Sequence, residues 1–417
     1  MNSLGAETLF SRFLAGLGSE TIHVAAGLSS DFEIGTTAVS HFASHSHHPW
    51  PDVTEDAVRQ AWNDASTRLD LKWRHIFGNV IPEAQRHIAG HLDLDHPERL
   101  IFSPNTHEML VRLFSCFANK RSESDPVRIL TTDAEYHSAM WQFSRWNELP
   151  YVTVTPIPVE PFHTFEERFK AEAGKNKWDM VYLSHVFFNS GLMVSDLEDI
   201  VDAFTDPETM IIIDGYHGFM AKPTSLKKIQ GRAFYLAGGY KYAMAGEGAC
   251  FLYAPTHCPW NPYDIGWFAL FPYLQAGLPF GQSINFGNQA NKFWGATFDP
   301  TGLYRLNAVM RLFAEKGMTV TKMDQYVMGL QNYFLEELAR EPIPWLTDLI
   351  TPRDLFRAGH FLTYRLPNAP KREEQLLQKG IIVDSRSNSM RFGFGIYQDR
   401  LMIDRMLERA RSIPVGV

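Results

Sequence analysis

Two residues with complementary chemistry lie at the ends of two successive apolar runs in the middle of the chain. Residues 210–213 are apolar and largely β-branched, which predicts a buried strand, and Asp214 follows them directly. A second apolar run, residues 233–237, is followed by two glycines and then Lys241. A lysine among apolar and aromatic residues can lose its proton and attack an aldehyde, while a carboxylate at a neighbouring strand end can hold a pyridine nitrogen protonated. The pairing therefore indicates an aldehyde cofactor that carries a pyridine ring.

A lysine aldimine with an acidic partner for the ring nitrogen is the arrangement of pyridoxal 5'-phosphate enzymes. The stretch 210–253 resembles the kynureninase branch of the class V aminotransferase family, which has Asp-x-x-His followed by an aldimine lysine within Tyr-Lys-Tyr or a similar sequence. Here the matching residues are Asp214, His217, Tyr240 and Lys241. The bland alternative is a core strand with a capping Asp and a surface Lys. Asp-x-x-His alone would favour that alternative, but the GGYKY sequence at this distance favours the cofactor.

Composition limits the class of protein. The chain has 417 residues, 45% of them hydrophobic, which is enough for a large core and two domains. A net charge of −8 without a basic block makes nucleic acid an unexpected partner. No apolar run approaches the about 20 residues that span a bilayer, and the N-terminus lacks the pattern of a signal peptide. Three cysteines are too few for a disulfide framework, so we expect a cytoplasmic protein with reduced thiols and no membrane partner.

Strands and helices alternate between residues 100 and 255, which predicts an α/β layer with a mostly parallel sheet. Ligands of such sheets lie outside the carboxyl ends of the strands. The candidates that lie at or beyond predicted strand ends are Thr106, Tyr136, His185, Asp214 and Lys241. The resemblance implies a fold type I PLP-dependent transferase. We expect an N-terminal arm and loop over residues 1–50 with a short helix at 4–17, a large cofactor-binding domain over 51–315, and a small α+β domain over 316–417.

The resemblance also implies how the cofactor is held. Thr106 and His107 match a phosphate-holding turn between a strand and a helix, although the same residues would make an ordinary N-capped helix. Tyr136 is expected to stack on the pyridine ring, with His137 as the competitor for that role. The remaining cofactor contacts that we expect within one chain are Ser138, His185, His217 and Tyr240.

Two further matches imply an assembly. Trp267, in the sequence IGWF, resembles a tryptophan that reaches the phosphate from the other subunit, and Thr297 matches a phosphate-contacting Thr or Asn. Together they imply a homodimer with shared active sites. Core packing of Trp267 is the alternative.

An arginine and a histidine loop bear on the substrate. Arg391 resembles the arginine that pairs with the α-carboxylate of the substrate, and a guanidinium suits a carboxylate bidentately. Arg386 and Arg357 are expected to be structural. The sequence HFASHSHH, residues 41–48, has four histidines but no nearby cysteine or carboxylate, so we expect no metal site and place His48 at the mouth of the active site.

The resemblance implies an enzyme that acts on a small amino acid. Lys241 would hold the cofactor and, once an external aldimine forms, carry the proton at Cα, while Asp214 would stabilise the ring through the Cα carbanion. A lyase or hydrolase of the kynureninase type is expected, with a class V aminotransferase as the alternative. Cysteine desulfuration is disfavoured because no cysteine follows Cys258. A non-catalytic binding protein with this fold would have no use for both Asp214 and Lys241.

Overall fold

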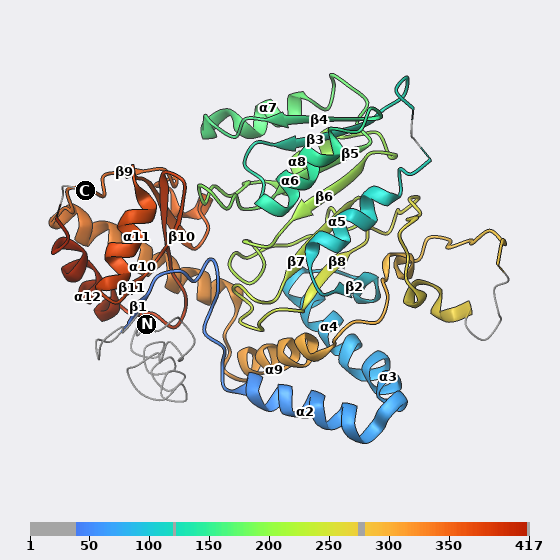
Figure 1. Ribbon diagram of the computed structural model, residues 1–417, viewed down its shortest axis with the longest axis horizontal. Coiled ribbons are helices and arrows are strands. Elements are labelled where there is room, and N and C mark those ends of the chain that lie inside the picture. Colours follow the sequence, from blue (N-terminus) through green and yellow to red (C-terminus); the bar gives the residue numbers. More distant parts are fainter. Residues whose placement is uncertain (1–38, 120–121, 274–279, 415–417) are drawn as a thin grey trace.

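The computed structural model describes residues 39–119, 122–273 and 280–414, so the helix expected at 4–17 lies outside the described residues. A seven-stranded sheet forms its centre (Figure 1). The order of the strands is β2 (Leu100–Ser103), β8 (Cys250–Tyr253), β7 (Ala233–Gly238), β6 (Met210–Asp214), β5 (Met180–Ser184), β3 (Val127–Thr132) and β4 (Val152–Ile157).

Five neighbouring strands of this sheet, β7 to β4, run parallel, and β8 runs antiparallel to both β7 and the edge strand β2. Every residue of β5, β6 and β7 is buried, which explains their unbroken apolar sequences, because a parallel sheet is covered on both faces. The predicted α/β fold with a mostly parallel sheet is therefore confirmed. Strand β6 extends one residue beyond the predicted run, so Asp214 is its last residue.

Helices surround the sheet and connect its strands. They are α2 (Val53–Arg68), α3 (Lys72–His75), α4 (Ile81–Leu92), α5 (Thr106–Ser115), α6 (His137–Trp146), α7 (Phe165–Ala171), α8 (Leu197–Ala203) and α9 (Thr301–Glu315). The side chains of Asn105 and Asp196 cap α5 and α8 by accepting backbone N–H bonds. Thr54 lies in the first turn of α2, where its hydroxyl donates to the carbonyl of Pro51.

The C-terminal part has a sheet of its own. Strands β12 (Asp384–Arg386), β13 (Ser389–Gly393), β10 (Phe361–Arg365) and β9 (Asp348–Leu349) form an antiparallel sheet. It is accompanied by α10 (Val320–Arg340), α11 (Ala369–Gln378) and α12 (Arg400–Arg411). This mixture of helices and antiparallel strands matches the expected smaller α+β unit, while the boundaries at residues 50 and 315 stay predictions.

The start of the described chain joins this C-terminal part. Strand β1 (Ser40–His41) pairs in parallel with β11 (Ile381–Ile382), and Figure 1 shows both beside α12. The backbone N–H of Phe42 donates to the Ile382 carbonyl, and Gly393 N–H donates to the Phe42 carbonyl. The histidine loop is thereby held by the C-terminal unit.

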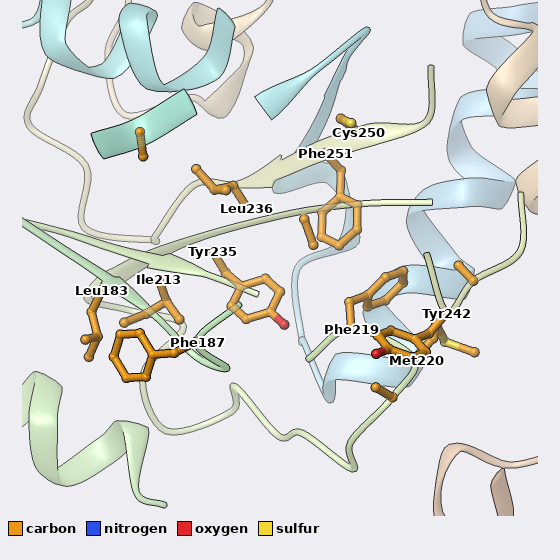
Figure 2. Packing of buried hydrophobic residues seen from close by; sticks show 14 of the residues in the cluster. Leu183, Phe187, Ile213, Phe219, Met220, Tyr235, Leu236, Tyr242, Cys250 and Phe251 are labelled. Atoms are coloured by element: carbon orange, nitrogen blue, oxygen red, sulfur yellow. The ribbon is translucent and has the colours of Figure 1, made fainter. Parts of the chain in front are cut away.

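The core beneath the sheet edge is aromatic and tightly packed. Figure 2 shows Tyr235 of β7 beside Ile213 of β6 and Phe187. A Cβ on Gly215 would lie 1.9 Å from the Tyr235 ring, so only glycine can follow Asp214 in this packing. Within the described residues, no helix is long and apolar enough to cross a membrane.

Candidate active site

A cavity of about 510 Å³ opens at the carboxyl ends of the parallel strands, as expected for a sheet of this type. Asp214 at the end of β6 and Lys241 beyond β7 both line it. Other residues expected at the site also line it, namely Thr106, His107, Tyr136, Ser138, His217 and Tyr240. The structure thus brings together most of the residues singled out from the sequence. His48, His185, Trp267, Thr297 and Arg391 are not among the residues that line this cavity.

Lys241 is buried, with 5% of its surface exposed, and no carboxylate of the described residues contacts its amine. Its Nζ forms a hydrogen bond of 2.7 Å with Nε2 of His217 and lies 4.9 Å from the centre of the Tyr216 ring. Burial lowers the pKa of Lys241 to about 7, Asp214 raises it, and Arg391 lowers it further. Burial also lowers the pKa of His217 well below its ordinary value, so that ring is neutral. A neutral, nucleophilic amine is therefore present near neutral pH.

Each oxygen of the Asp214 carboxylate accepts one hydrogen bond from a neighbouring residue. The Tyr182 hydroxyl donates to one of its oxygens at 2.6 Å, and the Tyr216 backbone N–H donates to the other at 2.9 Å. Burial raises the pKa of Asp214, while these two hydrogen bonds and the charge of Lys241 act in the opposite direction. A protonated ring nitrogen in the cavity would complete the compensation of this buried carboxylate.

Helix α5 begins at the cavity wall. Its first two residues, Thr106 and His107, line the cavity together with the capping residue Asn105. The Asn105 side chain accepts from the Glu108 N–H at 2.9 Å, which leaves the earlier amides of the first turn without an intrahelical partner. Backbone amides at the N-terminus of a helix are suited to a phosphate group.

Aromatic side chains form another part of the cavity wall. Tyr136 lies with its ring centre 5.5 Å from Lys241 Nζ, and Phe188 packs edge-on against Tyr136 at 5.5 Å between ring centres. The competitor, His137, is the first residue of α6 and stacks on Trp141 instead. This arrangement favours Tyr136 as the ring that would cover a flat cofactor.

Arg391 lies directly behind Phe188 and is 5% exposed. Its Nη1 donates to the Phe188 carbonyl at 2.8 Å, and its Nη2 donates to Asp384. The buried Nε of Arg391 has no hydrogen-bond partner among the described residues. Burial would raise the pKa of Asp384, but the hydrogen bond from His45 and the charge of Arg391 hold it well below its usual range. Arg391 therefore keeps one buried donor for a further acceptor, although it does not line the cavity itself.

The structure corrects the position expected for His48. The His48 ring is buried between the rings of Tyr242 and Tyr397, whereas its neighbour His47 stacks on Tyr240 at 5.2 Å. The side chain that reaches the cavity wall is thus one residue earlier in the loop. A run of consecutive polar residues gives no periodicity from which the inward-facing side chain could be chosen.

His185, the residue after β5, is buried beside the cavity rather than in its wall, with its ring against Gly218. Among the described residues, no group of three or more His, Cys, Asp and Glu side chains is arranged to hold a metal ion.

Trp267 and Thr297 contact each other but not the cavity. The Trp267 indole N–H donates to the Thr297 hydroxyl at 2.9 Å, and 38% of Trp267 is exposed. Its neighbour Phe271 is 44% exposed. Trp267 is therefore not packed in the core of the single chain. Together with Phe271 it presents an aromatic surface to solvent.

Several residues of the site were not singled out from the sequence. Tyr182 inside β5 and Phe188 beyond it are indistinguishable from core residues in the sequence. Asp384, in a short strand near the C-terminus, and Glu135, which precedes Tyr136, carried no signal in the sequence. A fully buried acid can be recognised as such only when its neighbours in space are known.

The chain matches the family model Aminotransferase class-V over residues 54–351 and the model Kynureninase C-terminal domain over residues 325–409. A kynureninase from Pseudomonas fluorescens is 24% identical over 219 residues, which span 52% of this chain and 51% of that protein. The alignment thus covers about half the length of each.

Solved structures share the fold over most of the chain. A cysteine desulfurase from Thermococcus onnurineus NA1 superimposes with a TM-score of 0.72 at 17% identity, covering 89% of this chain and 93% of that chain. A lysine-to-alanine mutant of C-DES, with glycine covalently linked to the PLP cofactor, gives a TM-score of 0.75 at 15% identity, covering 90% and 97%.

The fold is that of fold type I PLP-dependent enzymes. The chain belongs to the class V aminotransferase family and resembles its kynureninase branch, and its cofactor is pyridoxal 5'-phosphate.

The residues present fit this cofactor. The cavity offers one buried neutral amine for an aldehyde, one buried carboxylate for a ring nitrogen, and the N-terminus of α5 for a phosphate. Tyr136 supplies an aromatic face in the same cavity.

Proposed function

We propose that this protein is a kynureninase-like enzyme that cleaves an amino acid, with Lys241 and Asp214 as its catalytic residues. The observation that carries the proposal is the environment of Lys241, a buried amine with a pKa of about 7 in the same cavity as a hydrogen-bonded carboxylate. When bound, pyridoxal 5'-phosphate withdraws electrons from Cα of the amino acid.

Each residue has a separate task in this proposal. Lys241 binds the cofactor aldehyde and, once released by the substrate amine, moves the proton at Cα as a neutral base near the operating pH. Asp214 keeps the ring nitrogen protonated, because its own hydrogen bonds from Tyr182 and Tyr216 hold the carboxylate in place. Thr106 and His107 bind the phosphate at the α5 N-terminus, with Ser138 beside them in the cavity wall.

Arg391 orients the substrate. Its unpartnered Nε is a buried donor behind Phe188, which lines the cavity, and the salt bridge to Asp384 fixes the guanidinium plane. We infer that His48 acts only indirectly, through packing on Tyr242 next to Lys241, since its ring is buried away from the cavity. His185 supports the cofactor side of the site in the same indirect way, whereas His217 lines the cavity and forms a hydrogen bond with Lys241 Nζ.

The kynureninase C-terminal match over residues 325–409 includes Arg391 and favours carbon–carbon cleavage. The longer match to the class V model favours transamination as the second candidate. We do not expect kynurenine itself to be the substrate, because the histidine loop and the Tyr136–His137 pair depart from the sequence of that branch.

A spectrum and a product analysis test the proposal. The purified protein should absorb at about 400–430 nm, and borohydride should bleach this band and fix the cofactor on the peptide that contains Lys241. A panel of amino acids then separates the two reactions, because cleavage between Cβ and Cγ leaves alanine whereas transamination leaves a 2-oxo acid. Absence of the band after addition of pyridoxal 5'-phosphate would refute the proposal.

We also propose that the enzyme acts as a two-fold homodimer in which Trp267 and Thr297 reach the phosphate of the neighbouring chain. The exposure of Trp267 and Phe271 supports this, because aromatic residues are enriched in interfaces. Cofactor bound by both chains would stabilise the dimer, so dilution should release cofactor and lower activity together. A fully active monomer in sedimentation would contradict it.

We also propose that the protein is cytoplasmic. The three cysteines are free, as expected of thiols in a reducing compartment.

A further inference from the structure

A second acid lies beside Asp214 and has no task in the proposed reaction. Glu135 stands between β3 and α6, immediately before Tyr136, and none of its surface is exposed. A carboxyl group in such a position normally pairs with a cation. The contacts that the structure gives to Glu135 are instead all with neutral donors.

Three hydrogen bonds hold the Glu135 carboxyl. The Thr132 hydroxyl donates to Oε1 at 2.7 Å and the Ser184 backbone N–H donates to the same oxygen at 3.3 Å, while the Ser184 hydroxyl contacts Oε2. Ser184 is the last residue of β5, lines the cavity, and pairs in register with Asp214 on β6. Glu135 therefore contacts the cavity wall through Ser184, by its backbone N–H and its hydroxyl.

The charge on Glu135 depends on its neighbour. Burial raises the pKa of Glu135 to about 8, the hydrogen bonds from Ser184 and Thr132 lower it, and the charge of Asp214 raises it further. Two carboxyl groups in one buried region do not ionise together easily. The charge of Lys241 lowers the pKa of Asp214, whereas no cation of the described residues contacts Glu135, so Glu135 is the acid that retains its proton near neutral pH.

The proton on Glu135 decides the direction of the Ser184 hydroxyl. An ionised carboxylate can only accept, so the Ser184 hydroxyl must donate to it. A neutral Glu135 can donate from Oε2 to Ser184 Oγ, and the Ser184 hydroxyl is then free to donate into the cavity. The two protonation states thus present different groups beside Asp214.

We propose that Glu135 is a positioning residue of the cofactor site, which as a neutral acid turns the Ser184 hydroxyl toward the cavity and keeps a single negative charge at Asp214. The inference rests on the proposed function for its effect on the cofactor, but the protonation of Glu135 is independent of it. Above about pH 8 the added charge and the reversed hydroxyl change the surroundings of the bound cofactor.

Glu135→Gln is a close mimic of the neutral acid, because its amide can accept from Thr132 and donate to Ser184. We expect the absorbance spectra of the wild-type holoenzyme and of Glu135→Gln to coincide at about pH 7 and to diverge above about pH 8. Spectra that coincide at every pH, or that differ already at about pH 6, would overturn the proposal.

Glu166 provides a matched control. Its carboxylate also accepts from the backbone and hydroxyl of one serine, Ser195, at 2.7–3.1 Å, but it pairs with Arg357 at 2.7 Å and does not line the cavity. Glu166→Gln should therefore leave the pH dependence of the cofactor spectrum unchanged. The same divergence in Glu166→Gln would show that loss of any such carboxylate causes it, and would overturn the assignment to Glu135.

An infrared titration of the cofactor-free protein separates this proposal from the proposed function. We expect a neutral-carboxyl band that disappears as the pH rises through about 8 and that is missing in Glu135→Gln. Its presence in protein that binds no cofactor would support the protonation of Glu135 even if the proposed function failed. A wild-type protein without this band would overturn the inference, whether or not the variant folds.

Discussion

Two lysines in this molecule are almost equally buried and have opposite surroundings. Lys222, with 4% of its surface exposed, donates to Asp324 at 2.8 Å and to the Leu355 carbonyl at 3.4 Å. Lys241, 5% exposed, has a neutral imidazole and tyrosine rings around its amine. Burial alone therefore does not decide what a lysine does.

The role of each lysine depends on the group that faces its amine. Asp324 lies between Lys222 and His360, and although burial would raise its pKa, the hydrogen bonds from His360 and Lys222 lower it. The ion pair between Lys222, in the loop after β6, and Asp324, in α10, holds these two parts of the chain together. The Lys241 amine has no such pair among the described residues, and it gives up its proton. Lys222 therefore stabilises the fold, whereas Lys241 has an amine that can react.

The largest effect should follow from Lys241→Ala. The band of the lysine-linked cofactor should vanish and turnover should fall on the order of 10⁴-fold, because both the nucleophile and the base at Cα are removed. Circular dichroism and absorbance would be recorded on the same sample. An unchanged band in a folded variant would show that Lys241 does not hold the cofactor, and the difference from Lys222 would then have no chemical meaning.

Lys222→Ala should act on stability instead. Removal of one partner leaves Asp324 buried without its cation, which costs about 3–5 kcal/mol in the free energy of unfolding. Urea denaturation measures this, and the cofactor band of the folded variant should keep its position. Lys222→Met combined with Asp324→Leu should recover most of the loss, because it removes both charges together.

Asp214→Asn tests the role of the carboxylate that lines the same cavity as Lys241. The variant should still bind cofactor but lose activity by about 10²–10³-fold, because an amide cannot stabilise a protonated ring nitrogen. The Lys241 pKa should also fall, since Asp214 is the main group that raises it. Turnover like that of the wild type would mean that another residue faces the ring nitrogen.

The smallest effect is a pH dependence in the cofactor-free protein. Because the Lys241 pKa is lowered to about 7, its rate of modification by an amine-directed reagent should rise up to about pH 7 and level off above it. The rates of exposed lysines should continue to rise toward about pH 10. Mass spectrometry of the labelled peptides reads both rates. Modification of Lys241 that keeps rising to about pH 10 would place its pKa in the ordinary range.

The sequence was sufficient for the parts of the site that follow regular structure. Asp214 and Lys241 each come after a fully buried apolar run, and parallel strands bring their carboxyl ends to one edge. The pairing of His45 with Asp384 could not be foreseen, because 339 residues separate them and neither lies in a periodic pattern. Glu135 was missed for a related reason, since its burial depends on Ser184 and Thr132 from two different strands.

The pairing of β1 with β11 has a consequence for the order in which the protein is built on the ribosome. The large sheet is complete once residue 253 has been synthesised, but Ser40 finds its partner only when Ile381 emerges. Domains that fold during synthesis generally do so from the N-terminal end, and long-range pairings form slowly. The histidine loop is therefore among the last parts to settle, so a nascent chain has its reactive lysine in place long before the loop beside it is held.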